Sequence, residues 1–178
     1  MPRGGAAEGQ QGAEVLRLVR EVALLTLHRA TVEDWPAWRD ARLAALTEAP
    51  HAFKSRLADW PRGGEQRWRE RLELPGALNL LARLDGVLAG MASGLRLPDD
   101  VVEVRSVWVS PHARGHRVGD RLLEAVEQWA RGQGAVAVRL FVLAGNERAI
   151  ALYRRHGFVA AGESGAELRM RKTLRFPA

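Results

Sequence analysis

Cysteine is absent from the 178 residues of this chain, and its absence excludes several kinds of chemistry. A disulfide framework, a cysteine-ligated zinc site and a thiol nucleophile each require a cysteine side chain. A covalent thioester intermediate on the protein is excluded for the same reason. Any catalysis by this chain must therefore use other side chains or the backbone.

Long apolar segments are also missing. The apolar runs span only a few residues, whereas a membrane-spanning helix needs roughly 20. The opening residues are rich in Gly, Ala and Gln and lack a signal-peptide cleavage pattern. We therefore expect residues 1–23 to form a flexible tail, residues 24–178 to form one domain, and the protein to be cytoplasmic.

Lysine is nearly absent too: it occurs only at positions 54 and 172, so 25 of the 27 basic residues are Arg. Residues 1–104 hold 14 basic and 15 acidic side chains (net −1), whereas residues 105–178 hold 13 and 6 (net +7). The excess surrounds residues 114–121. A local basic field of this kind suits a polyphosphate ligand and equally an acidic macromolecular partner, whereas nucleic acid is not the expected ligand.

Turn and cap signals predict alternating strands and helices. Asp85-Gly86 is a strong signal for a two-residue hairpin, and Gly132-Gln133-Gly134 ends a helix before an apolar strand. Residues 50–64 contain two Pro and a Gly pair, which indicate a loop or broken helix that borders a substrate site. The expected elements are strands at 24–30, 77–83, 87–95, 101–109, 135–143 and 167–174, and helices at 31–47, 65–74, 118–131 and 147–156.

The order of these elements predicts a mixed α/β sheet of six or seven strands. The strands from 77 to 109 follow one another through short turns, which indicates an antiparallel meander. Strand 101–109, the following helix and strand 135–143 form a crossover, which implies that these two strands are parallel. In the helix at 31–47, the apolar residues Trp35, Trp38, Leu43 and Leu46 recur at helical spacing and are expected in the core.

A glycine-containing loop lies between the end of strand 101–109 and the next helix. Gly115 and Gly119 let the backbone turn sharply, so that several N–H groups can point outward at the start of the helix. The positive end of the helix dipole adds to this potential. Such a loop suits a pyrophosphate, although taken alone it also serves as ordinary punctuation between strand and helix.

Two longer motifs carry a resemblance to a known family. Residues 107–111, Val-Trp-Val-Ser-Pro, lead into Arg114 and Gly119, and this segment resembles motif A of the GNAT family of N-acetyltransferases. That family's loop reads Gln/Arg-x-x-Gly-x-Gly/Ala, and Arg117 stands here where the central glycine usually stands. Arg117 costs backbone freedom if that position needs a positive φ, and it offers a guanidinium to a phosphate.

Residues 146–158 resemble the family's motif B more closely. The pattern Asn-x-x-Ala-x-x-Leu-Tyr-x-x-x-Gly-Phe is matched at every named position, by Asn146, Ala149, Leu152, Tyr153, Gly157 and Phe158. Helix capping explains Asn146 and Gly157 without any function. It does not explain Tyr153, which is the only tyrosine in the chain.

The resemblance implies a GNAT fold, in which a central parallel pair of strands splays into a V and about four helices flank the sheet. It also implies acetyl-CoA as cosubstrate, with the pantetheine arm pairing along the strand that ends at Val109. A homodimer through the C-terminal strands is expected as well. The donor-binding residues that it implies are Val107, Trp108, Val109, Arg114, Gly115, His116, Arg117, Val118, Gly119, Asp120, Asn146, Ala149 and Tyr153.

The chemistry of direct transfer to an amine requires two proton movements. An alkylamine with a pKa near 10.4 must lose a proton before it attacks, and the CoA thiolate, with a thiol pKa near 8.5, should gain one. The resemblance suggests Tyr153 as the acid and Glu103 as the base. Phe141 stands where other members carry a glutamate. Glu103 would act directly or through a water, and a mechanism without a dedicated base stays open. Glu103 is also compatible with the structural role of an exposed strand carboxylate that pairs with Arg105.

Other functions remain open at the level of sequence. The chain would also suit a silent acyl-CoA-binding module, or a basic protein- or RNA-binding domain on the same fold. The five histidines form no metal-ligand motif, so no metal is expected. No motif identifies the acceptor amine, which would be a small molecule or an amine of a peptide or protein.

Overall fold

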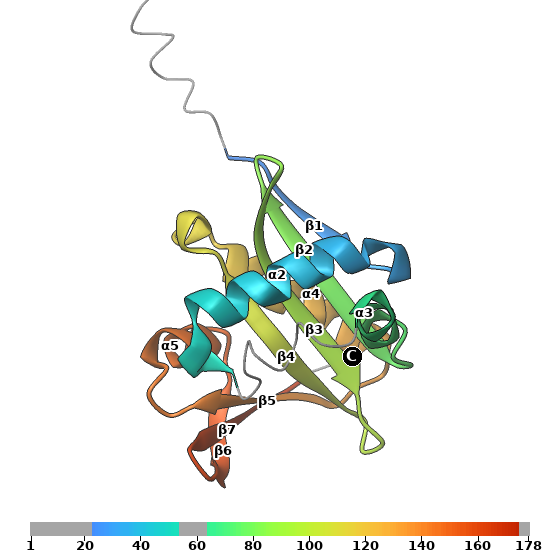
Figure 1. The fold of residues 1–178 in the computed structure, drawn as a ribbon. Coiled ribbons are helices and arrows are strands. Elements are labelled where there is room, and N and C mark those ends of the chain that lie inside the picture. The colour runs from blue at the N-terminus through green and yellow to red at the C-terminus, as the bar shows by residue number, and fades with distance from the viewer. Residues whose placement is uncertain (1–22, 54–63, 175–178) are drawn as a thin grey trace, which may run out of the picture.

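The computed structural model describes residues 23–53 and 64–174, which form one seven-stranded sheet covered by helices on both faces (Figure 1). The strand order is β1-β2-β3-β4-β5-β7-β6. The strands are β1 (Leu25–Arg29), β2 (Ala77–Leu84), β3 (Val87–Arg96), β4 (Val101–Val109), β5 (Ala137–Leu143), β6 (Val159–Ser164) and β7 (Glu167–Thr173). The expected tail at 1–23, except Ala23, and most of the expected loop at 50–64 lie outside the described residues.

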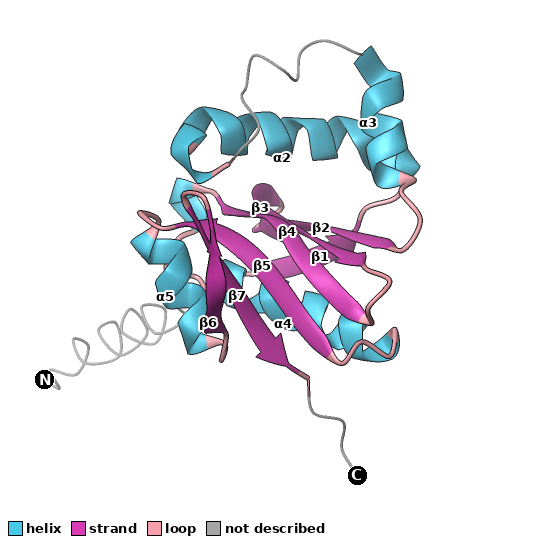
Figure 2. Ribbon diagram, turned by 90° about the horizontal axis from the view of Figure 1, so that it is seen from below, coloured by secondary structure: helices cyan, strands magenta, loops and turns pink. Residues whose placement is uncertain are grey.

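Four helices of the described part form the two outer layers. They are α2 (Trp35–Glu48), α3 (Gly64–Leu72), α4 (Val118–Gly132) and α5 (Glu147–Arg155). Figure 2 shows α2 and α3 on one face of the sheet and α4 on the other. The predicted helices and strands are thus confirmed with shifts of a few residues at their ends. β6 is the exception, since no strand was predicted at 159–164.

The sheet is antiparallel except between its two central strands. β4 and β5 run parallel, and they pair only over Val101–Glu103 and Ala137–Arg139. All the other neighbouring strands are antiparallel. The prediction of a mixed sheet with one parallel pair is confirmed.

A bulge explains why β4 leaves β5 so early. Met91 of β3 faces Trp108, and Ser93 faces Arg105, so two steps along β3 match three along β4. Within this bulge, Ser106 has a φ of 55°. A bulge bends its strand and increases the local twist. Gly90 permits the close approach there, because a Cβ at this position would lie 2.6 Å from the carbonyl oxygen of Trp108.

The sheet separates two apolar cores. On the α4 face, Leu122 and Val126 pack with Val138 and Leu140. On the α2–α3 face, Trp38 and Trp68 pack with Met91 and Trp108. Trp38 and Leu46 are buried as predicted, whereas Trp35 and Leu43 are only partly buried. Because both faces of the sheet are packed, β4 and β5 are held firmly on either side of the gap between them.

Candidate functional site

A cavity of about 1610 Å³ opens where β4 and β5 diverge; we call it the large cavity. Its lining comes from the end of β4, the loop before α4, the first turn of α4, residues 143–146 and one face of α5. Sites for small ligands usually measure about 300–1,000 Å³. The large cavity therefore suits a long ligand.

The loop that enters α4 presents unpaired backbone amides to the large cavity. Gly115 has a φ of 84°, and Arg117, the N-cap residue, has a φ of 59°. The amides of Val118, Gly119 and Asp120 have no acceptor within the described residues. Free amides at a helix start bind anions. Arg117, which replaces the central glycine of the family's loop, therefore does need a positive φ. It adopts a conformation that glycine would adopt more easily.

Arg114 is held by a carboxylate that the sequence did not reveal. Its Nη2 donates to Oε1 of Glu48, at 2.6 Å, and Trp108 Nε1 donates to Glu48 Oε2, at 3.1 Å. Burial raises the pKa of Glu48, but the hydrogen bonds and charge of Arg114, with the help of Trp108, outweigh this effect and lower the pKa below its ordinary value. The end of α2 is thereby tied to the loop before α4.

Asp120 links the first turn of α4 to the end of α5. Its Oδ1 accepts hydrogen bonds from Arg155 Nη2, at 2.9 Å, and from His156 Nε2, at 2.8 Å. Burial raises the pKa of Asp120, yet the hydrogen bonds from His156 and Arg155 lower it below its ordinary value overall. Asp120 thus stays ionised, and its partners balance the charge that it brings to the large cavity.

Tyr153 of α5 lines the large cavity. Its ring packs against Phe158 with centroids 5.9 Å apart, and the residue is only 6% exposed. The hydroxyl has no hydrogen-bond partner among the described residues. Burial raises the pKa of Tyr153 far above its ordinary value. The side chain therefore keeps its proton and has a donor available for a ligand.

The start of α4 and the middle of α5 approach each other closely. A Cβ at Gly119 would lie 3.0 Å from Cδ2 of Leu152. Asn146 caps α5 by accepting a hydrogen bond from the amide of Ala149, at 3.3 Å. The two segments that the resemblance singled out are thus in contact across one end of the large cavity.

The structure brings nearly all the predicted donor-binding residues together. Every one of them lines the large cavity except His116, which is exposed on the loop. Glu103 does not line it either. Residues at the cavity that sequence reasoning missed come from the end of α2, from β5 and from the outer positions of α5: Glu48, Phe53, Leu143, Arg148, Arg155 and His156.

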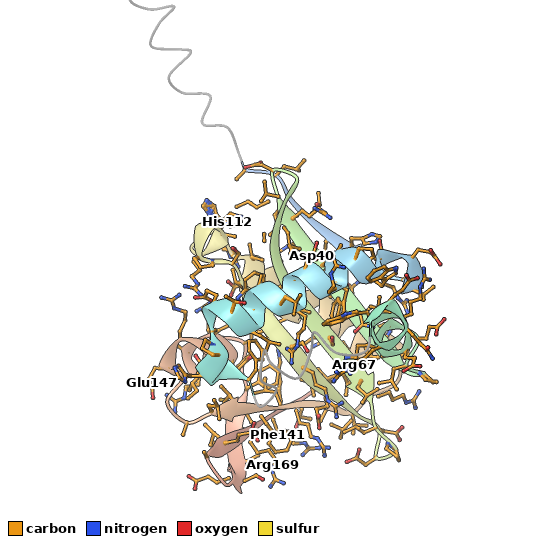
Figure 3. All side chains as sticks on the ribbon, in the orientation of Figure 1. Asp40, Arg67, His112, Phe141, Glu147 and Arg169 are labelled. Carbon is orange, nitrogen blue, oxygen red and sulfur yellow. The ribbon has the colours of Figure 1, made fainter. Side chains whose placement is uncertain are left out.

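Glu103 lies on β4 at the closed end of the V, between two arginines. Its Oε1 accepts from Arg105 Nε at 2.5 Å, and its Oε2 accepts from Arg139 Nε at 3.0 Å. The predicted pair with Arg105 is confirmed. Phe141 stands two residues after Arg139 on β5, where Figure 3 labels it, and it is 37% exposed. Both carboxylate oxygens of Glu103 thus accept hydrogen bonds from arginines.

Within the described residues there is no group of three or more His, Asp or Glu side chains arranged to hold a metal ion. None of the helices in that part of the chain is long and apolar enough to cross a membrane.

Comparisons with known proteins agree with the geometry. The model of the acetyltransferase (GNAT) family matches residues 35–158, which is more than half of the chain. An IAA acetyltransferase of Azospirillum brasilense is 36% identical over 97 residues, 54% of this chain and 63% of that protein. A mycothiol acetyltransferase of Paenarthrobacter aurescens is 32% identical over 132 residues, 71% of this chain and 40% of that protein. This chain thus spans less than two thirds of the length of either relative.

Among solved structures, the PaiA N-acetyltransferase of Thermoplasma acidophilum in complex with coenzyme A is similar with a TM-score of 0.72. The match covers 85% of this chain and 99% of that chain, at 19% identity. At this identity the similarity concerns the fold alone.

Proposed function

Because the chain belongs to the GNAT family of acetyltransferases, we propose that it is an N-acetyltransferase that moves the acetyl group of acetyl-CoA directly onto a primary amine. The observation that carries this proposal is the large cavity, which runs from the free amides at the start of α4 to the buried hydroxyl of Tyr153. One end of it suits an anion and the other a proton transfer.

The amides of Val118, Gly119 and Asp120 would hold the pyrophosphate of acetyl-CoA. Their N–H groups lack protein acceptors in the described structure, and the dipole of α4 adds positive potential at the same place. Arg117 is exposed beside them and offers its guanidinium to the phosphates or to the solvent around them. Arg114 is less available to the phosphates, since its guanidinium already donates a hydrogen bond to Glu48.

The pantetheine arm would lie along β4 beyond Glu103. No strand pairs with β4 on the β5 side past that residue in the described sheet, so backbone groups near Val107 and Val109 are open to an extended ligand. Both residues line the large cavity. Such pairing would direct the thioester toward α5.

Tyr153 would act as the acid. The amine nitrogen attacks the acetyl carbonyl carbon, the carbon–sulfur bond breaks, and the sulfur takes the proton of the Tyr153 hydroxyl. The nitrogen gives up one proton to water, and the tyrosinate is protonated again from water. The raised pKa of Tyr153 means that the hydroxyl carries its proton before the reaction. The absence of cysteine agrees with direct transfer, without an acetyl-enzyme intermediate on a thiol.

Glu103 is less well placed to act as the base. A general base must reach the proton of the amine directly or through one water, whereas both oxygens of Glu103 accept from arginines. We infer that the amine reaches the site neutral or gives its proton to water. Glu103 would then serve to hold Arg105 and Arg139 in place.

We also propose that residues 24–178 act as one catalytic domain in the cytoplasm. The large cavity takes residues from α2 through α5, so neither half of the chain could form it alone. The expected homodimer stays a prediction, with β6 as the edge strand of the sheet.

The test is release of free CoA thiol from acetyl-CoA in the presence of a panel of amines and a metal chelator. We expect release that depends on one class of amine and that the chelator does not change. Tight binding of acetyl-CoA without release for any amine would contradict catalysis and favour a silent acyl-CoA-binding module.

A further inference from the structure

A second pocket, of about 440 Å³, lies beside the large cavity, on the face of the sheet that α2 and α3 cover; we call it the arginine pocket. Arg42 of α2, Arg71 of α3 and Arg105 of β4 line it, and Phe53 and Phe141 are among its apolar walls. Figure 3 labels Phe141 on β5.

The two sites are neighbours. Ala52 and Phe53 line both of them. Along β4, residues 103–106 line the arginine pocket and residues 107–109 line the large cavity, and a strand advances only about 3.3 Å per residue. A molecule bound in the arginine pocket therefore lies within reach of a thioester held along the end of β4.

The three arginines gather positive charge in a poorly solvated place. Arg42 is 9% exposed, its guanidinium lies over the ring of Phe53 at 4.7 Å, and its Nη1 lies 3.5 Å from Ser106 Oγ. Burial lowers the pKa of Arg42 to about 10, helped by the charge of Arg71. Burial, and then the charge of Arg105, lower the pKa of Arg71. Like charges thus lie close together.

Among the described residues that line the arginine pocket, there are three arginines and two carboxylates. Glu103 is shared between Arg105 and Arg139, and Glu167 also lines the pocket. Arg139 itself lies outside the lining and also pairs with Asp99, at 4.0 Å. Arg71 has no ion pair or hydrogen bond within the described residues. A partly buried cation such as Arg71, which has no counter-charge in that part of the chain, is costly, and an anion bound beside it would lower this cost.

We propose that the arginine pocket binds a carboxylate of the acceptor, so that the substrate is a small molecule carrying both a primary amine and a carboxylate. The inference rests on the proposed function. A guanidinium binds a carboxylate through two parallel hydrogen bonds, which fixes orientation as well as position. With the carboxylate held by Arg71 and its neighbours, the amine end points toward the large cavity.

The experiment compares amines that differ only in charge. Glycine, β-alanine and γ-aminobutyrate are each paired with their carboxamides, and kcat/KM is measured at saturating acetyl-CoA. We expect at least one acid to exceed its carboxamide by about tenfold or more, the factor of one charge-assisted hydrogen bond. Comparable values for acid and carboxamide in all three pairs overturn the inference and leave the acetyltransferase proposal standing.

Variants at Arg71 test whether the preference for an acid over its carboxamide arises in the arginine pocket. Arg71→Gln should reduce the ratio of acid to carboxamide toward one, mainly through KM, whereas Arg71→Lys should keep part of it. Arg69→Gln is the matched control, because Arg69 lies on the same helix but pairs with Glu33 and Glu65 and lines neither site. A ratio that Arg71→Gln leaves unchanged contradicts the role of the arginine pocket.

A binding measurement separates this inference from the proposed function. Calorimetry with N-acetyl-β-alanine and its carboxamide, on protein loaded with CoA, needs no turnover. Tighter binding of the acid that Arg71→Gln removes supports the pocket even if no amine is acetylated. Equal binding of both compounds overturns it. Loss of acetyl-CoA binding itself would instead contradict the acetyltransferase proposal, which the Arg71 variants should not affect.

Discussion

The large cavity and the arginine pocket lie on the same two strands, but they are built differently. The large cavity draws most of its lining from two continuous stretches, 107–120 and 143–156, and the anion site that we propose at one end of it consists of backbone amides. The arginine pocket takes one or two side chains from each of several elements. Backbone sites depend on local conformation, which nearby residues determine. Side-chain sites depend on how distant elements pack.

If this comparison is right, changes in the two regions should separate donor binding, chemistry and acceptor choice. Substitutions in the large cavity should affect acetyl-CoA or kcat, and those in the arginine pocket should affect the acceptor.

The largest effect is expected for Gly119→Glu. The Cβ of the new side chain would lie 3.0 Å from Cδ2 of Leu152. Its carboxylate would bring a negative charge to the amides proposed to bind the pyrophosphate. Acetyl-CoA affinity, measured by calorimetry, should fall by more than about a hundredfold. Gly119→Ala is the steric control and should cost much less, since only a leucine side chain must move. Wild-type affinity in Gly119→Glu would mean that the donor binds elsewhere.

The next effect is on the chemical step. Tyr153→Phe keeps the ring that packs on Phe158 but removes the proton donor. We expect acetyl-CoA affinity within about twofold of wild type and a kcat lowered by about 10²-fold, within the range for positioned proton transfer. A loss in kcat of less than about tenfold would show that the hydroxyl is not an important acid.

A smaller effect is expected at Arg114. Arg114→Ala removes a cation near the proposed phosphates and leaves Glu48 with Trp108 but without its arginine partner, so acetyl-CoA should bind several-fold more weakly at low salt. The loss should shrink as salt rises, because the interaction is ionic and partly exposed. Titrations at two ionic strengths check this. The same loss at both would place Arg114 away from the phosphates.

The smallest effect on kcat is expected for Glu103→Gln. This change loosens Arg105 and Arg139 but leaves the large cavity intact, so kcat should stay within about threefold of wild type and KM for the acceptor should change more. The pH profile of kcat/KM decides the role. Loss of its acidic limb together with a kcat lowered by 10²-fold or more would identify Glu103 as the base after all.

The missing prediction of β6 shows where sequence patterns fail. The sequence of residues 159–164 shows neither alternation of apolar and polar residues nor enrichment in β-branched residues. In the structure these residues are nearly all exposed, and Gly162 has a φ of 127°. They form a strand because β7 offers an edge to pair with. By contrast, the turn signals at Asp85-Gly86 and Gly157 depend only on nearby residues. The strands and the helix that end at these turns were predicted within a few residues.

Glu48 illustrates the same limit within the site. It ends a helix that was predicted well, but nothing near it in the chain indicates that it meets Trp108 and Arg114, 60 and 66 residues away. Arg42 and Arg71 are comparable: each looks like a solvated helix charge until α2 and α3 pack over the sheet. Of the two arginines that bind Glu103, only Arg105 was predicted from the sequence, because it lies on the same strand as Glu103. Arg139 lies on β5.

By itself, the sequence determined the order of the elements, the glycine-containing turn before α4 and the motif around Tyr153, because caps, turns and spacing act between residues close in the chain. Only the tertiary structure decided how the bulge at Ser106 opens the sheet, which carboxylates neutralise which arginines, and that Arg42, Arg71 and Arg105 meet in one pocket. The reason is physical: burial and charge pairing depend on distances through space, which packing sets.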